Sequence, residues 1–236
     1  MSDRPLVSFV VPAYNEQKAL PATLAGIHAA ARALALRYEI VVADDASTDE
    51  TASLATAAGA RVVHVEFRQI SRTRNAGARA AAGDPIFFVD ADTHIHATVL
   101  RHALAALDAG AVGGGAMPRF DEAAPGWSRA AMCAVVGPMR LLNMAAGCFV
   151  FVWRAPFMAV GGFDERHFAG EEIMLSQALK RHGRFVILPD RVETSSRKFT
   201  SGSAWQTLGM SLRLLSRGMR GARRREGNEF WYDGKR

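Results

Sequence analysis

A short apolar run changes into an acidic turn within residues 39–50, which read EIVVADDASTDE. Its first five residues have the length and the apolar character of a β-strand. Ser47 and Glu50 follow with the spacing of a capping box, which predicts the start of a helix. The stretch therefore predicts a strand, a turn that carries the adjacent carboxylates Asp44 and Asp45, and a helix.

The same pattern recurs on both sides of this stretch. The further elements that periodicity predicts are strands at residues 6–11, 61–65, 86–89, 149–153 and 185–188, and helices at 20–34, 71–82 and 171–182. Strands that alternate with helices and are joined by short turns indicate βαβ units. We therefore expect an α/β fold with a mostly parallel central sheet flanked by helices.

The composition is that of one globular domain with a short appendage. The chain has 236 residues, of which 49% are hydrophobic, which excludes disorder over most of its length. No apolar run approaches the ~20 residues needed to cross a bilayer. The first residues show no signal-peptide pattern, so the prediction is a cytoplasmic protein. Two cysteines, Cys133 and Cys148, cannot form a disulfide framework and are expected to be small core residues.

The positive charge is concentrated at the C-terminus. The net charge is +6, and residues 212–236 contain eight basic and three acidic side chains. Apolar residues recur at helical spacing over 205–219 beside this basic stripe, so a tail helix at 205–225 is expected either to lie on an anionic membrane or to dock on the domain. Nucleic acid is not an expected partner, because the aromatic residues lie in apolar runs instead of between basic ones.

Acidic side chains follow two of the predicted strands. Asp44 and Asp45 end one strand, and Asp90 and Asp92 follow another. In parallel sheets ligands bind beyond the carboxyl ends of the strands, and two carboxylates at i and i+2 can hold Mg²⁺ or Mn²⁺. Acids at strand ends also commonly cap the next turn, so both interpretations stay open for the second pair.

The turn after the first strand reads PAYNE at residues 12–16 and contains no glycine. Without Gly-x-Gly-x-x-Gly a Rossmann dinucleotide site is not expected. The glycine run at 113–115 does not supply one, because it follows no strand-to-helix turn of the required form. His94 and His96 are expected to face solvent instead of binding zinc.

Two further groups of charged residues are candidates for the site. Arg72, Arg74 and Arg79 lie on a predicted helix, where they either face the acidic strand ends or a phosphate, or form a solvated basic face. Glu171 and Glu172 open another helix, where the helix dipole favours acids and where a general base is also suitably placed.

Five short motifs follow one another in order over about residues 6–198. They are VVPAYNE at 10–16, VVADDASTD at 41–49, RNAG at 74–77, FVDAD at 88–92, and GGFDE at 161–165 followed by GEE at 170–172. In this order they resemble the family 2 glycosyltransferases of the GT-A fold, within the nucleotide-diphospho-sugar transferase superfamily. The resemblance implies a glycosyltransferase domain at 1–200, with a nucleotide-sugar-binding half at 1–95 and an acceptor half at 96–200, followed by a basic tail at 201–236.

The resemblance also implies roles for individual residues. Those that it places at the nucleotide-sugar are Pro12, Tyr14, Glu16, Asp45, Arg74, Asp90 and Arg197. It implies that Asp45 accepts a hydrogen bond from the base, that Asp92 is the direct ligand of Mg²⁺ or Mn²⁺, and that Asp90 is a second ligand near the sugar. Glu172 stands where the family has a catalytic aspartate, and Glu171 remains the alternative base.

The implied reaction is the inverting, metal-dependent transfer of a sugar from a nucleotide-diphosphate donor, expected to be a UDP-sugar, to the hydroxyl of a lipid-linked or saccharide acceptor. The Gln-x-x-Arg-Trp motif of processive members is missing, so a single addition is expected. Two alternatives remain. One is a catalytically silent nucleotide-sugar-binding scaffold. The other is a sugar-phosphate nucleotidyltransferase, which would need a glycine-rich basic loop where PAYNE stands.

Overall fold

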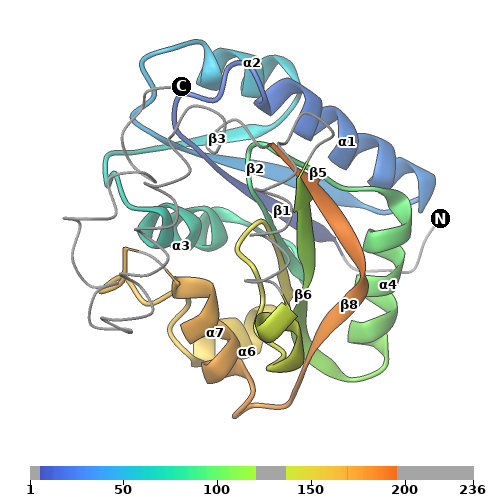
Figure 1. The fold of residues 1–236 in the computed structure, drawn as a ribbon. Helices are drawn as coiled ribbons and strands as arrows, with labels where there is room; N and C mark the ends of the chain where they lie inside the picture. The colour runs from blue at the N-terminus through green and yellow to red at the C-terminus, as the bar shows by residue number, and fades with distance from the viewer. Residues whose placement is uncertain (1–5, 121–136, 169, 196–236) are drawn as a thin grey trace.

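The computed structural model describes residues 6–120, 137–168 and 170–195, and Figure 1 shows their arrangement. The predictions for Arg197, Cys133 and the tail helix at 205–225 lie outside these residues. Among the described helices, none combines the length and the apolar character that crossing a membrane requires.

One sheet of eight strands runs through the described residues in the order β3-β2-β1-β4-β7-β6-β8-β5. The strands are β1 (Val7–Ala13), β2 (Tyr38–Asp45), β3 (Arg61–Val65), β4 (Ile86–Val89), β5 (Thr93–His94), β6 (Ala111–Phe120), β7 (Phe149–Val152) and β8 (Arg184–Thr194). Strands β3, β2, β1 and β4 are parallel to one another, as are β6 and β8. Strand β7 pairs antiparallel with β4 and β6, and β5 pairs antiparallel with β8. The predicted α/β fold with a mostly parallel sheet is confirmed.

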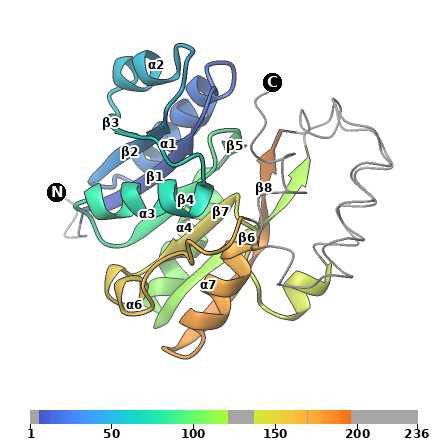
Figure 2. The ribbon, with the colours of Figure 1, turned by 90° about the vertical axis from the view of Figure 1, so that its left-hand side faces the viewer.

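Helices cover both faces of this sheet. One layer consists of α1 (Leu20–Ala33), α2 (Thr51–Ala57) and α4 (Ala97–Asp108), and the other of α3 (Ile70–Ala80), α6 (Arg154–Ala159) and α7 (Glu171–Leu179). Figure 2 brings α3, α6 and α7 to the front of the sheet. Every residue of β1 and β4 is buried, which explains why these strands read as unbroken apolar runs.

The strand order reverses at β1. Strand β2 lies on one side of β1 and β4 on the other, so the turns that follow these three strands open at the same edge of the sheet. This is the place where open α/β sheets bind ligands. The topology therefore brings the PAYNE turn, the Asp44-Asp45 turn and the Asp90-x-Asp92 turn together.

The predicted capping box is wrong. Helix α2 begins at Thr51, and the backbone N–H groups of its first turn donate no hydrogen bond to the Ser47 side chain. The Ser47 hydroxyl instead accepts a hydrogen bond from the backbone N–H of Asn15 at 2.9 Å. A contact to the neighbouring turn replaces the local cap, and it connects the loops that follow β1 and β2.

Strand β6 was not predicted, because Gly113, Gly114 and Gly115 have low strand propensity. The glycines allow the neighbouring strands to approach closely. A Cβ atom on Gly113 would lie 2.7 Å from the Phe151 carbonyl oxygen, and one on Gly114 would collide with the carbonyl oxygen of Val186. Close packing against β7 and β8 therefore overrides the propensity.

Gly77 has a comparable role where α3 packs on the sheet. A Cβ atom there would collide with Cγ1 of Val10, which lies in the interior of β1. We expect Gly77→Ala to lower the free energy of unfolding by about 1–3 kcal/mol, because a buried β-branched side chain cannot move aside freely.

The matched control is Gly26→Ala in α1, where the added Cβ would lie 3.6 Å from its nearest neighbour. This substitution should leave stability unchanged or raise it by about 0.5–1 kcal/mol, as alanine does in a helix. Urea denaturation of both variants checks the prediction, and equal effects of the two substitutions would contradict it.

Candidate active site

The turns after β1 and β2 are held together by reciprocal hydrogen bonds. Asn15 donates its backbone N–H to Ser47, and its side-chain oxygen accepts from the backbone N–H of Thr48 at 2.8 Å. Glu16 is buried, and its backbone N–H donates to the Thr51 hydroxyl at 2.8 Å. Asn15 adopts a left-handed conformation, with φ of 52°, so this part of the edge is fixed by the fold.

Asp45 is engaged by its own chain. Its carboxylate accepts the backbone N–H groups of Phe67, Arg68 and Gln69 at 2.6 to 3.1 Å, and the Thr73 hydroxyl at 2.8 Å. These four hydrogen bonds use the acceptor positions of a carboxylate. If Asp45 accepted the predicted hydrogen bond from a base, one of these four would therefore have to be given up.

Asp44 points to the other face of β2 and is also buried. Its Oδ2 lies 3.2 Å from Nδ1 of the exposed His64. Its Oδ1 is buried and accepts no hydrogen bond within the described part of the chain. An unpaired buried carboxylate oxygen is unusual in proteins, and no motif had given Asp44 a role of its own.

Tyr14 follows the end of β1 and is partly exposed. The guanidinium carbon of Arg68 lies 3.7 Å from the centre of its ring, within the range of a cation–π contact. Pro12, the other residue expected at a base, is buried within β1. The structure thus brings the predicted residues of β1 and β2 to one edge, and adds Arg68, which no motif had indicated.

Arg74 lies at the centre of the site, and 2% of its side chain is exposed. One guanidinium nitrogen donates to Glu171 at 2.7 Å, and another donates to Asp90 at 2.7 Å and to the Gly147 carbonyl at 2.9 Å. Although burial lowers the pKa of Arg74, the charges of Asp90 and Glu171 raise it above its usual value. The guanidinium is therefore a fixed positive charge between β4 and α7.

Asn75, the next residue of α3, fixes the GGFDE loop. Its side-chain nitrogen donates to the Phe163 carbonyl at 2.9 Å and to Glu165 at 3.0 Å, and its oxygen accepts the Phe163 N–H at 2.9 Å. Gly162 approaches the same amide so closely that a Cβ atom would lie 2.6 Å from it. Arg74 and Asn75 thus join two motifs that are about 90 residues apart.

Glu171 and Glu172 are neighbours with different surroundings. Glu171 is buried and paired with Arg74, and burial raises its pKa although Arg74 opposes this. Glu172 is partly exposed, and burial together with the charge of Glu171 raises its pKa to about 8. Arg74 donates its hydrogen bonds to Glu171, Asp90 and Gly147 instead of to the Glu172 carboxylate. Glu172 is therefore the better placed of the two to exchange a proton.

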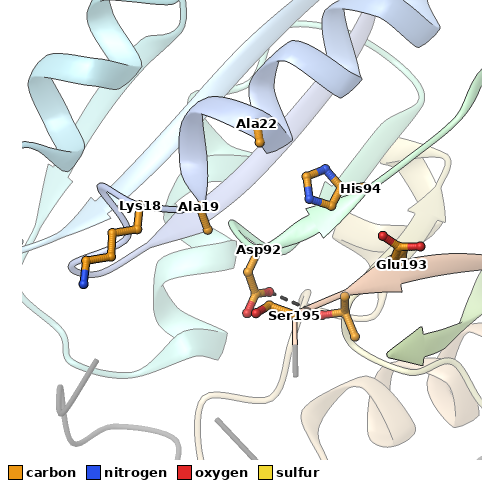
Figure 3. A pocket seen from close by; sticks show the side chains of 8 residues that line it. Lys18, Ala19, Ala22, Asp92, His94, Glu193 and Ser195 are labelled. Carbon is orange, nitrogen blue, oxygen red and sulfur yellow. Dashed lines mark hydrogen bonds between the residues drawn. The ribbon is translucent and has the colours of Figure 1, made fainter. Parts of the chain in front are cut away.

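Asp92 lies at a pocket of about 240 Å³ on the α1 side of the edge (Figure 3). Its carboxylate accepts a hydrogen bond from the Thr194 hydroxyl at 3.4 Å. The residues that line the pocket are Lys18, Ala19, Ala22, Asp92, His94, Glu193, Thr194 and Ser195. Asp90 and Asp92 are thus not equivalent, since Asp90 faces Arg74 and Asp92 faces this pocket.

The pocket also revises the prediction for the histidines. His96 is exposed, as expected, but His94 is partly buried in the pocket wall. Within the described residues no group of three histidine, cysteine or acidic side chains lies close enough to hold a metal ion by itself. Lys18, Glu193 and Ser195 were missed because the sequence carries no sign that the end of β8 meets α1. Cys148 is buried as predicted, and burial raises the pKa of its thiol.

The chain is similar in sequence to known glycosyltransferases. The sequence model of glycosyl transferase family 2 matches residues 8–161. Among curated relatives, undecaprenyl-phosphate 4-deoxy-4-formamido-L-arabinose transferase of Serratia proteamaculans is 39% identical over 93 residues, and the match covers 36% of this chain and 28% of the relative. The enzyme of that name from Yersinia enterocolitica is 38% identical over 94 residues, with the same coverage.

Solved structures share the fold. The mannosyltransferase PcManGT from Pyrobaculum calidifontis, in complex with GDP-Man and Mn²⁺, superposes with a TM-score of 0.68 at 21% identity over 88% of this chain and 60% of that one. TarS 1–349 of S. aureus, in complex with UDP-GlcNAc, gives 0.62 at 19% identity over 89% of this chain and 64% of that one. At this identity the likeness concerns the fold alone. The match of the family to most of the described domain identifies the chain as a member of glycosyl transferase family 2.

Proposed function

We propose that the chain is an inverting, metal-dependent glycosyltransferase that moves a sugar from a UDP-sugar to an acceptor in a single addition. The observation that supports this most directly is the Arg74 cluster. It connects Asp90, which follows the strand expected at the donor, with Glu171 at the start of the helix that carries the proposed base. A nucleotidyltransferase or a catalytically silent scaffold would not need the partly exposed carboxylate of Glu172, the second residue of α7.

The donor nucleotide is proposed to bind at the turns after β1 and β2. Tyr14 offers an aromatic face, and Pro12, Glu16 and Asp45 shape the surrounding backbone. Asp45 acts there as a positioning residue, since its hydrogen bonds hold residues 67–69 where Arg68 reaches Tyr14. Arg197 remains a proposed contact to phosphate.

The donor set at Asp90 and Asp92 fits Mg²⁺ or Mn²⁺. Both side chains offer carboxylate oxygen, the ligand that hard divalent cations prefer. Mg²⁺ is commonly held by one or two carboxylates, with substrate phosphates and water completing its shell. When bound, the cation would neutralise the charge that develops on the departing diphosphate.

The acceptor side is proposed to be served by Glu172. Its carboxylate removes the proton from the acceptor hydroxyl as the oxygen attacks the anomeric carbon and the bond to the diphosphate breaks. Glu171 stays paired with Arg74 and positions the start of α7. Inversion follows from a single displacement, in which the acceptor attacks from the face opposite to the leaving group.

The names of the curated relatives favour a second acceptor class, a lipid phosphate. A phosphate monoester has lost its proton near neutral pH, because its second pKa is about 6. Such an acceptor needs no general base. The contribution of Glu172 therefore distinguishes a hydroxyl acceptor from a phosphate acceptor.

Titration calorimetry with UDP, in the presence and absence of Mn²⁺, tests the donor site. We expect Mn²⁺ to tighten UDP binding about tenfold or more, and Asp92→Asn to remove this increment, because the substitution replaces a carboxylate ligand with a neutral amide. His96→Ala is the matched control, since this exposed side chain lies near Asp92 in sequence and outside the pocket lining. UDP binding that does not respond to Mn²⁺, or an Asp92→Asn protein that keeps the full response, refutes the metal-dependent donor site.

The pH dependence of turnover tests the base. A donor screen first selects the UDP-sugar, and its hydrolysis is then measured with water as the hydroxyl acceptor. The kcat of this hydrolysis should rise as pH increases through about 8, where Glu172 loses its proton. Glu171→Gln removes a neighbouring negative charge, which lowers the pKa of Glu172 and moves this rise to lower pH. Glu172→Gln should lower kcat by about 10²–10⁴ and abolish the rise.

Glu66→Gln, at an exposed position outside the site, is the control and should retain the wild-type profile. The profile is then repeated with undecaprenyl phosphate as acceptor. A wild-type kcat/KM that is far higher for the lipid phosphate than for water, together with a large loss in Glu172→Gln for water only, supports the phosphate as the acceptor class. An unchanged kcat for water in Glu172→Gln rules out Glu172 as the base.

A further inference from the structure

Two consecutive leucines are exposed beside α7, on a helical turn at residues 137–141 and directly after it. The side chains of Leu141 and Leu142 are 86% and 57% exposed. Leucine is among the residues most often buried in proteins, and exposed apolar side chains bordered by polar ones mark contact sites. Figures 1 and 2 both show this turn next to α7.

The surroundings of these leucines are basic. Arg140 precedes them, and Lys180 and Arg181 follow the end of α7; all three are exposed. The Lys180 ammonium group donates to the Leu142 carbonyl at 2.5 Å, which places it beside the leucines. Of the ion pairs between described residues, none involves Arg140, Lys180 or Arg181.

We propose that Arg140, Leu141, Leu142, Lys180 and Arg181, here called the basic-leucine surface, contact an anionic lipid bilayer. Unpaired basic groups attract anionic headgroups, and adjacent apolar side chains insert at the boundary between headgroups and acyl chains. The dipole of α7 favours basic residues at its C-terminus, which accounts for Lys180 and Arg181. It accounts neither for Arg140 nor for the exposed leucines.

The basic-leucine surface is connected to the Arg74 cluster through α7 and through the chain that follows Leu142. Helix α7 begins at Glu171 in the Arg74 cluster and ends next to Lys180, and nine residues of helix span about 13 Å. The chain that leaves Leu142 reaches the cluster at Gly147, whose carbonyl accepts from Arg74. A lipid-linked acceptor at the bilayer surface would thus meet the site from this side, a step that rests on the proposed function. The membrane contact itself does not rest on it.

Vesicle flotation of the full chain tests the proposal, with vesicles of phosphatidylcholine alone and with about 30% phosphatidylglycerol. The wild type should bind the anionic vesicles and bind the neutral ones far less. The charge variant Arg140→Glu/Arg181→Glu should lower the partition coefficient by at least about 25-fold, since each lost basic residue accounts for roughly fivefold and the new glutamates also repel the anionic headgroups. The apolar variant Leu141→Ser/Leu142→Ser should lower it by about tenfold.

Matched controls separate this surface from general charge and apolar effects. Arg37→Glu/Arg101→Glu makes the same change of net charge at exposed positions elsewhere, and Met158→Ser removes another exposed apolar side chain, which is 54% exposed. Both controls should bind within about twofold of the wild type if the contact is specific. UDP binding by calorimetry should be the same in all these variants, since none of the changed residues lies at the donor turns.

Several outcomes overturn the proposal. They are a wild type that does not float or that floats equally with neutral vesicles, surface variants that float like the wild type, and controls that lose binding as much as the surface variants. If the surface variants float like the wild type, any membrane contact belongs to another part of the chain. The basic-leucine surface would then be assigned to a protein partner. Failure of UDP binding would contradict the proposed function and leave the vesicle result unaffected.

Discussion

The buried guanidinium of Arg74 is the interaction on which the arrangement of the site depends. A buried charge is stable only when it is paired and hydrogen-bonded, and removing a partner from such a group typically costs about 3–5 kcal/mol. The acceptors for Arg74 come from three separate segments, at Asp90, Gly147 and Glu171. The end of β4, the approach to β7 and the start of α7 therefore cannot separate without leaving this charge unpaired.

Helix α3, which carries Arg74, explains the spacing of the RNAG motif. Arg74 collects the carboxylates, Asn75 makes reciprocal hydrogen bonds with the GGFDE loop, and Gly77 lets α3 lie against Val10 of β1. The three positions face different parts of the molecule, yet each needs α3 at one distance from the sheet. A bulkier residue at position 77 would move the guanidinium and the amide together, so packing and electrostatics are coupled through one helix.

Sequence periodicity predicted the parts of the fold that are determined locally, and it failed where distant chain segments decide. The buried strands β1, β2 and β4 and the helices between them follow from apolar runs and spacing. Strand β6 was missed because its glycines are required by the close approach of the carbonyl groups of β7 and β8, which sequence periodicity does not reveal. Ser47 was assigned to a cap because its partner, Asn15, lies on another turn. Likewise, the sequence left open whether Arg74 faces the acidic strand ends, and the structure pairs Arg74 with Asp90 while Asp92 lines the pocket beside α1.

The proposed donor and acceptor sides of the site are held in place by different interactions. The proposed donor side consists of turns at the ends of parallel strands, whose positions the sheet fixes, and the family match at residues 8–161 includes all of them. The proposed acceptor side begins at Glu171, beyond that match, where the ion pair with Arg74 holds the start of α7. Because Glu171 supplies the carboxylate that pairs with Arg74, the side chain at position 172 is not needed for that ion pair. The glutamate at this position, where the resemblance implies an aspartate, therefore lengthens the proposed base without taking part in the hydrogen bonds that hold the turns after β1 and β2.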